Sequence, residues 1–327
     1  MQLPTLDQIH AAQAIVYRYM PPTPQYSWPL LNERLGAEVW IKHENHTPVG
    51  AFKIRGALVY LNWLKETQPE IAGVIAATRG NFGQGVAMAA RLFGLKAVIV
   101  VPHGNSVEKN RAMLAQSAEL IEHGHDFQES FEHAQALSKQ RGVAFVESFH
   151  ERLVMGTATY ALELLHAAPP LDVIYVQIGL GSSICGVAAV RNALGQSTEI
   201  VGVVAAQSPS YSRSFQERKV VEAPSTTAIA DGLACRRPDP LALDAILQNV
   251  SRVIEVSDAE IMDSMRAYYQ DTHNLAEGAG AASLAGALKE KNGLHGKHAG
   301  IILTGGNVDS EIYAAVLNHK INSGRVA

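Results

Sequence analysis

The chain has 327 residues, of which 47% are hydrophobic and 18% charged, and its formal net charge is −4. This length suits one large or two medium domains with a sizeable core. The acidic balance offers no basic surface for nucleic acid or an anionic membrane, so we expect neither as a partner and expect a small-molecule substrate instead.

The N-terminal segment and the cysteines indicate a cytoplasmic location. The first residues, MQLPTLDQIHAAQ, lack the basic-then-apolar layout of a signal peptide. No apolar stretch approaches the roughly 20 residues that cross a bilayer. Only Cys185 and Cys235 occur, so no disulfide framework is predicted and a reducing compartment fits.

The first predicted strand, residues 37–43, leads into the segment HTPVGAFKIRGALVY, which contains Lys53. Lys53 opens the helix predicted after this turn, where the positive end of the helix dipole disfavours a cation. Taken alone, such a lysine is more often a solvated surface cation, and we interpret Arg55 and Lys65 in that way. A helix N-terminus and partial desolvation would both lower the pKa of the Lys53 amine and favour its nucleophilic form.

Between residues 71 and 141, β-branched segments alternate with helical ones. Strands are predicted at 71–78, 96–102 and 118–123, and helices at 82–93, 108–117 and 127–141. The Val- and Ile-rich second strand is typical of a strand that is buried on both faces. The first strand runs into a small polar loop, Thr78-Arg79-Gly80-Asn81.

A glycine-rich loop follows the next strand. A helix is predicted at 153–167, a strand at 171–179 and a second helix at 184–194. The loop before that helix, which contains Gly179 and Gly181, is typical of an anion site that a phosphate can approach closely. Ile184 stands where a dinucleotide fingerprint needs Gly or Ala, and the next strand, at 199–207, supplies no acidic ribose partner. A single phosphate monoester fits better, and an amine beside such a site can form a Schiff base with pyridoxal phosphate.

The last predicted strand, residues 298–306, also ends in small residues, Leu-Thr-Gly-Gly. Repeated strand–helix–strand connections predict mostly parallel, twisted sheets flanked by helices, and therefore an α/β fold. In open α/β sheets, ligands bind beyond the carboxyl ends of the strands. We therefore expect the small-residue loops at these strand ends to share one pocket.

Six segments, in chain order, resemble the fold type II pyridoxal-phosphate enzymes of the tryptophan synthase β superfamily, above all the threonine dehydratase and serine racemase branch. They are ENHTPVGAFKIRGA, TRGNFGQGVA, GLGSSICG, ADGLA, EGAGAA and LTGGNVD. The resemblance implies a two-lobed fold with pyridoxal 5'-phosphate in the interdomain cleft. It also implies a large cofactor-binding domain of residues 1–65 and 149–327 and a small substrate-clasping domain of residues 66–148.

The resemblance further implies a role for each site residue. Lys53 would be the catalytic residue, joined to the cofactor as a Schiff base and then acting as acid and base. Asn81 would bond to the ring hydroxyl, and Thr304 would offer its hydroxyl to the ring nitrogen. The implied cofactor-binding set is Phe52, Lys53, Asn81, Gly179, Leu180, Gly181, Ser182, Ser183, Glu277 and Thr304. The implied substrate-binding set is Thr78, Arg79, Gly80 and Asn81.

The neutral hydroxyl of Thr304 points to the type of reaction. Such a group does not keep the cofactor ring protonated, so loss of a β-leaving group competes well against transamination. The resemblance therefore implies a carbon–oxygen lyase that converts L-threonine, L-serine or a related 3-hydroxyamino acid to the 2-oxo acid plus ammonia. Because members of this family usually form dimers or tetramers, we expect a homodimer or homotetramer.

Arg79 departs from the family pattern. It stands where racemases carry a serine that acts as acid and base, and an arginine cannot accept a proton, so serine racemase activity is less expected. Arg79 could pair with a second substrate carboxylate, which makes 3-hydroxyaspartate a second possible substrate, or it could face solvent or another subunit. The same scaffold would also suit a 3-phenylserine dehydratase, a β-replacement synthase, or a binding protein that kept the cofactor but lost turnover.

Further departures concern the substrate side and metal binding. Ala51 and Thr157 replace the family's usual Ser and Gln and are expected to alter the substrate side of the pocket. No dedicated metal is predicted, because the histidines lack further ligands at metal spacing. We expect these histidines to cap elements or to face solvent: His43, His46, His123 and His125.

Overall fold

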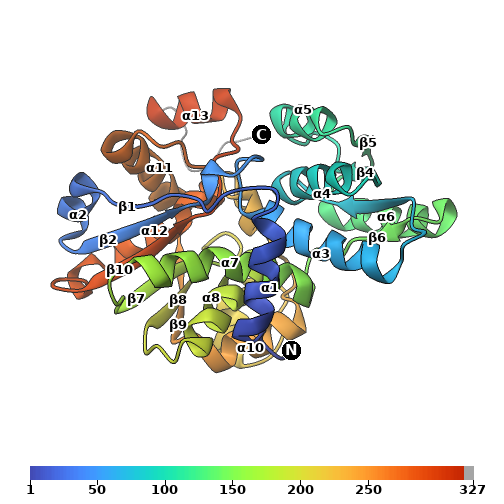
Figure 1. Cartoon of the computed structure of the whole chain (residues 1–327). Helices are drawn as coiled ribbons and strands as arrows, with labels where there is room; N and C mark the ends of the chain where they lie inside the picture. Colours follow the sequence, from blue (N-terminus) through green and yellow to red (C-terminus); the bar gives the residue numbers. More distant parts are fainter. Residues whose placement is uncertain (320–327) are drawn as a thin grey trace.

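Two sheets, each covered by helices, divide the molecule into two lobes (Figure 1). The structure is a computed structural model, and it describes residues 1–319. The six-stranded sheet contains, in spatial order, β1 (Gln25–Ser27), β2 (Glu38–His43), β10 (His298–Leu303), β7 (Val173–Gln177), β8 (Glu199–Ala205) and β9 (Arg252–Val256). The four-stranded sheet contains β5 (Glu119–Glu122), β4 (Lys96–Val101), β3 (Gly73–Ala77) and β6 (Ala144–Phe145).

All neighbouring strands run parallel, except that β1 pairs antiparallel with β2 at the edge of the six-stranded sheet. We call the six-stranded sheet with its helices the large lobe, and the four-stranded sheet with its helices the small lobe. Every strand predicted from the sequence is present. The predicted α/β fold with mostly parallel sheets is confirmed.

Helices cover both faces of the large sheet. One face carries α2 (Pro29–Leu35), α11 (Asp258–Thr272), α12 (Gly278–Lys289) and α13 (Ser310–Leu317). The opposite face carries α7 (Glu151–Ala167), α8 (Ser182–Ala193), α9 (Ser210–Glu217) and α10 (Pro240–Asn249). Within residues 1–319, no helix combines the length and the apolar composition that spanning a membrane requires.

The inner strand β3 of the small sheet is buried on both faces, because it is apolar at every position. Val74 and Ala76 of β3 pack toward α4 (Asn81–Leu92), and α5 (Val107–Ala115) adds Met113 to the same layer. Ile75 and Ala77 face the other way, toward α6 (Phe127–Arg141). Side chains that alternate between two apolar layers explain the continuous hydrophobic run that the sequence shows there.

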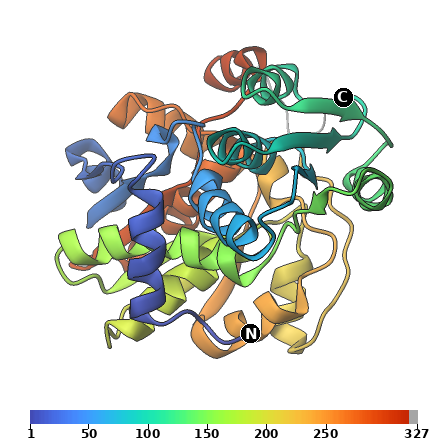
Figure 2. The same cartoon turned by 45° about the vertical axis from the view of Figure 1, so that its right-hand side comes forward.

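Helix α3 (Lys53–Thr67) lies between the two lobes (Figure 1). It packs against α4 on one side and α7 on the other, and α1 (Leu6–Val16) crosses α7 nearby (Figure 2). The strands of the small sheet lie between residues 73 and 145, inside the segment 66–148. We therefore propose a large domain of residues 1–65 and 149–327 and a small domain of residues 66–148. Residues 320–327 of the large domain lie outside the described part of the chain.

The first turn of α3 is held by a buried network of charged groups. Arg55 is fully buried and bonds to Glu44 at 2.7 Å and to Glu163 at 2.6 Å. The ammonium of Lys42 contacts the second oxygen of Glu163 at 2.5 Å. The interpretation of Arg55 as a solvated surface cation was therefore wrong, whereas Lys65 is partly exposed in the last turn of α3. Two cations and two carboxylates compensate one another here, which a buried charge requires.

Candidate active site

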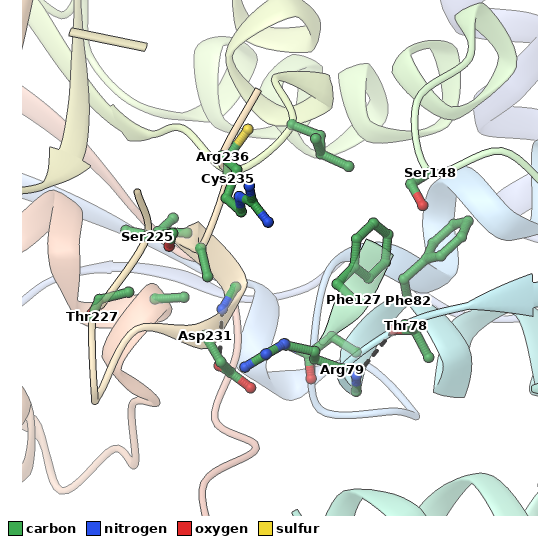
Figure 3. Close-up of a pocket in the computed structure, with 18 of the residues that line it drawn as sticks. Thr78, Arg79, Phe82, Phe127, Ser148, Ser225, Thr227, Asp231, Cys235 and Arg236 are labelled. Carbon is green, nitrogen blue, oxygen red and sulfur yellow. Dashed lines mark hydrogen bonds between the residues drawn. The ribbon is translucent and has the colours of Figure 1, made fainter. Parts of the chain in front are cut away.

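A cavity of about 900 Å³ opens between the lobes, beyond the carboxyl ends of β3, β7 and β10 (Figure 3). The loops after these strands all contribute to its wall, as does Lys53. The aromatic rings of Phe82 and Phe127 line the side of the cavity opposite to Asp231 (Figure 3). The sequence-predicted residues that line it are Phe52, Lys53, Thr78, Arg79, Gly80, Asn81, Gly179, Leu180, Gly181, Ser182, Ser183, Glu277 and Thr304.

Lys53 is the first residue of α3, and part of its surface faces the cavity. The turn before it is fixed by Thr47, whose hydroxyl bonds to the backbone of Ala51, and by Phe52, whose N–H donates to the carbonyl of Thr304 at 2.9 Å. Burial lowers the pKa of the Lys53 amine to about 8, while the nearby Glu277 carboxylate acts in the opposite direction. A substantial fraction of the amine is therefore neutral near physiological pH.

The loop from Gly179 to Ser183, which we call the anion loop, has the geometry of an anion site at the start of α8. Gly181 has φ +102°, which favours glycine, and a Cβ at Gly179 would lie 2.4 Å from the carbonyl oxygen of Gly232. Within residues 1–319, the N–H groups of Gly181, Ser182 and Ser183 have no acceptor, as is usual for the first turn of a helix. These N–H groups at a helix N-terminus suit a phosphate.

Residues of helix α7 hold this loop in place through hydrogen bonds. Thr157 donates to the carbonyl of Ser182 at 2.8 Å, and the hydroxyl of Tyr160 lies 2.6 Å from that of Ser183. Thr157 is buried and, like Ala51, lies outside the cavity wall. Ala51 and Thr157 therefore do not line the cavity themselves, and Thr157 contacts the anion loop; their expected effect on the substrate side stays a prediction.

Thr304 lies directly after β10 and is buried in the cavity wall. Its hydroxyl oxygen accepts a hydrogen bond from the side-chain amide of Gln177 at 2.5 Å. No acceptor for the hydroxyl proton of Thr304 is found in the described part of the chain. The Thr304 hydroxyl can therefore contact a ligand atom while Gln177 holds it in place.

Asn81 and Glu277 meet across the cleft. The side-chain amide of Asn307 donates to Asn81 Oδ1 at 2.8 Å, and Asn81 Nδ2 donates to Glu277 Oε1 at 2.5 Å. One N–H of Asn81 stays available for a ligand, since a primary amide has two. Burial raises the pKa of Glu277 to about 7, although the positive charge of Lys109 opposes this rise.

Lys109 is a cavity residue that sequence analysis missed. It lies on α5 and is only 6% exposed, and its ammonium contacts Asp231 Oδ2 at 2.5 Å and Glu277 Oε2 at 3.6 Å. Burial alone would lower its pKa, but the carboxylates of Asp231 and Glu277 hold it above the ordinary value. Nothing in the segment VEKNR marks Lys109, because its partners lie more than a hundred residues away in the sequence.

Thr78 and Arg79 differ in their surroundings. Thr78 is buried, and its hydroxyl accepts from the N–H groups of Gly80 and Gly83, which shapes the loop before α4. Arg79 is exposed at the cavity mouth and makes no ion pair with any described residue. In Figure 3 Arg79 and Asp231 line the same lower part of the cavity. The guanidinium of Arg79 can therefore meet an anionic ligand.

The histidines form no metal centre among residues 1–319, where no group of three or more metal-ligating side chains is close enough to hold an ion. His43 is fully buried and accepts a hydrogen bond from the indole of Trp28 at 2.9 Å. Burial lowers the pKa of His43 to about 3, so this ring stays neutral. His43 therefore does not face solvent; it stands at the N-cap position of the 3-10 helix Glu44–His46, although its side chain makes no capping hydrogen bond.

The cavity fits a small phosphorylated aromatic aldehyde. The unpaired N–H groups of the Gly179–Ser183 loop suit the phosphate, and the amine of Lys53 suits the aldehyde. Gln177 and Glu277 line the same cavity, and each has a buried side-chain oxygen that lacks a hydrogen-bond partner within residues 1–319. Such unpaired buried atoms indicate that a bound group completes the site.

Comparisons with known proteins agree with this chemistry. A family model described as pyridoxal-phosphate dependent enzyme matches residues 16–305. The chain is 31% identical over 323 residues to L-threonine ammonia-lyase of Thermotoga maritima, a match that covers 98% of this chain and 80% of that protein. It is 33% identical over 318 residues to L-threo-3-hydroxyaspartate ammonia-lyase of a Pseudomonas species, covering 97% and 99%. The solved structure of maize serine racemase has a TM-score of 0.90 and 30% identity, covering 97% and 98%.

Proposed function

Because the chain belongs to the family of pyridoxal-phosphate dependent enzymes, with pyridoxal 5'-phosphate as its cofactor, we propose that it is a β-eliminating ammonia-lyase. Its substrate in this proposal is L-threonine, L-serine or a related 3-hydroxyamino acid, and its products are the 2-oxo acid and ammonia. The observation that carries the proposal is the meeting of the Lys53 amine, the anion loop and the Thr304 hydroxyl in one cavity. Two relatives whose names describe ammonia-lyases support the reaction type.

The residues of the cavity can divide the work as follows. When bound, pyridoxal phosphate supplies an aldehyde for the substrate amine and a ring that takes up negative charge from the substrate α-carbon. The amine of Lys53 takes the α-proton, and the N–H groups of Arg79 and Asn81, which have no acceptor within residues 1–319, hold the substrate carboxylate. Thr304 would offer the bound cofactor a neutral hydroxyl rather than a carboxylate, an arrangement that would favour loss of the β-hydroxyl over transamination.

We test the proposal with a panel of threonine, serine, 3-hydroxyaspartate and 3-phenylserine, each in L and D form. We expect ammonia and a 2-oxo acid in equal amounts from at least one L-3-hydroxyamino acid, measured by an enzymatic ammonia assay. Conversion of L-serine to D-serine without ammonia would instead indicate a racemase. Release of ammonia from none of the compounds by the cofactor-loaded protein would contradict the proposal.

A second candidate is an ammonia-lyase for 3-hydroxyaspartate. The observation in its favour is Arg79, which is exposed at the cavity mouth without an ion pair among the described residues. A guanidinium pairs well with a carboxylate because it can donate two parallel hydrogen bonds. The Pseudomonas relative is named for L-threo-3-hydroxyaspartate, which carries such a second carboxylate.

Arg79→Met separates the two candidates. If Arg79 binds a second carboxylate, we expect KM for 3-hydroxyaspartate to rise about 10- to 100-fold, since a hydrogen bond to a charged group contributes about 1.5–3 kcal/mol. Steady-state kinetics should show little change for L-serine. Arg237→Met is the matched control, because Arg237 also lines the cavity but is paired with Glu222 at 3.4 Å. Equal losses with both substrates would show that Arg79 does not select acidic side chains.

We further propose that the enzyme is a cytoplasmic homodimer or homotetramer. The support is the resemblance to a family whose members usually form such assemblies, together with the cysteine usage, which fits a reducing compartment. Light scattering on the purified holoenzyme measures the mass directly. A monomeric mass near 35.2 kDa would contradict the oligomer.

A further inference from the structure

Lys109 reaches from the small lobe into the wall of the large lobe. Its stem belongs to α5, whereas Asp231 and Glu277, which its ammonium contacts at 2.5 and 3.6 Å, belong to the large lobe. The side chain passes closely over Gly80, where an added Cβ would lie 2.3 Å from Lys109 Cδ. The residue at position 80 must therefore be small for the ammonium to reach its partners.

The start of α5 is fixed to the large lobe on its other side as well. Ser106 donates to the carboxylate of Asp309, and Ser310 donates from its hydroxyl to Glu108 at 2.7 Å. These bonds place the helix that carries Lys109. The position of the ammonium therefore depends on contacts between the lobes and is not a chance orientation of a surface side chain.

The two oxygens of Glu277 have different surroundings. Oε1 accepts from Asn81 at 2.5 Å, whereas Oε2 has no hydrogen-bond partner within residues 1–319. A proton taken up by Glu277 would settle on the unpaired Oε2, because Oε1 already faces a donor. The Lys109 ammonium lies 3.6 Å from Oε2 and repels a proton there. Lys53 also interacts electrostatically with Glu277. The carboxylates of Asp231 and Asp309 raise the pKa of Lys109.

We propose that Lys109 is a positioning residue, which favours the ionised form of the buried Glu277 carboxyl group from across the cleft and thereby holds the amide of Asn81. An ionised Glu277 accepts more strongly from Asn81 than a neutral carboxyl group does. The second N–H of Asn81 then has a fixed direction toward the ligand. This inference rests on the proposed function at one point, namely that the ligand held by Asn81 is the cofactor. The charge state of Glu277 is a property of the protein that can be measured without turnover.

The test is infrared difference spectroscopy of the holoenzyme as a function of pH. The carboxyl band of Glu277 is assigned by its loss in Glu277→Gln. In Lys109→Met we expect this band to persist to a pH about 1 to 3 units higher than in the unsubstituted enzyme, the usual effect of a nearby charge. The midpoint of the acid limb in the pH profile of kcat/KM should also shift to a higher pH in Lys109→Met.

Two further variants make the result decisive. Asp231→Asn removes a negative charge that opposes the ionisation of Glu277, so the band should disappear at a lower pH. Arg111→Met removes an exposed cation from the same helix and should leave the band unchanged. A band with the same midpoint in all variants would overturn the inference. Should Lys109→Met fail to fold, Lys109→Gln removes the same charge while keeping a polar side chain, and an unchanged midpoint there contradicts the proposed role of Lys109.

Discussion

Lys53→Ala is expected to lower kcat/KM for ammonia release by at least about 100- to 10,000-fold, the range for loss of a general acid–base group. The loss should be larger still if Lys53 also anchors the cofactor. The other lysine in the cavity wall, Lys109, is paired with Asp231 and has a pKa above its ordinary value, so it cannot replace a neutral amine.

Ammonia release under saturating pyridoxal phosphate measures this effect, and circular dichroism verifies that the variant is folded. Lys65→Ala is the matched control, since Lys65 lies on the same helix but in its last, partly exposed turn. We expect that control to keep its activity within about a factor of 2. Undiminished turnover by Lys53→Ala would remove Lys53 from the proposed catalytic role.

Arg55→Met is expected to destabilise the fold by about 3–5 kcal/mol, which is the cost of removing one partner from a buried ion pair. The methionine leaves Glu44 and Glu163 in an apolar interior with only Lys42 as a cation. Because Arg55 holds the turn that carries Lys53, the variant should also bind pyridoxal phosphate more weakly.

Urea denaturation at several pH values measures the loss. Burial alone would raise the pKa of Glu163, but Arg55 and Lys42 hold it below the ordinary 4.5. The stabilisation is therefore present at neutral pH and is lost as the pH falls below about 4.5, so the difference between the two proteins should shrink in acid. Lys65→Met should change the free energy of unfolding by less than about 0.5 kcal/mol. An equally small change in Arg55→Met would contradict the role assigned to the buried network.

The strands and the cavity loops could be predicted from the sequence because their signals are local. Buried parallel strands read as continuous Val and Ile runs, and the loops after β3, β7 and β10 contain glycine or small polar residues. Lys53 stood out for the same reason, since its position at the start of an apolar helix conflicts with the helix dipole.

The partners of buried charges could not be predicted, because they depend on contacts between distant segments. Arg55 meets Glu163 across 108 positions of sequence, and Lys109 meets Asp231 across 122. Both cations occur in helical segments whose pattern is also typical of a solvated face. The short strands β1, Gln25–Ser27, and β6, Ala144–Phe145, were missed because two or three residues show no measurable alternation. The edge strand β9, Arg252–Val256, was also missed.

The backbone hydrogen bond from Phe52 to Thr304 has a consequence for how the site can work through many turnovers. It ties the lysine-bearing turn to the end of β10, and the anion loop follows β7, its neighbour in the same sheet. Thr78 to Asn81, in contrast, follow β3 and therefore belong to the small lobe. If the site residues have the proposed roles, separation of the two lobes would break the contacts of Thr78 to Asn81 with substrate and cofactor, whereas Lys53, the anion loop and Thr304 would keep theirs with the cofactor.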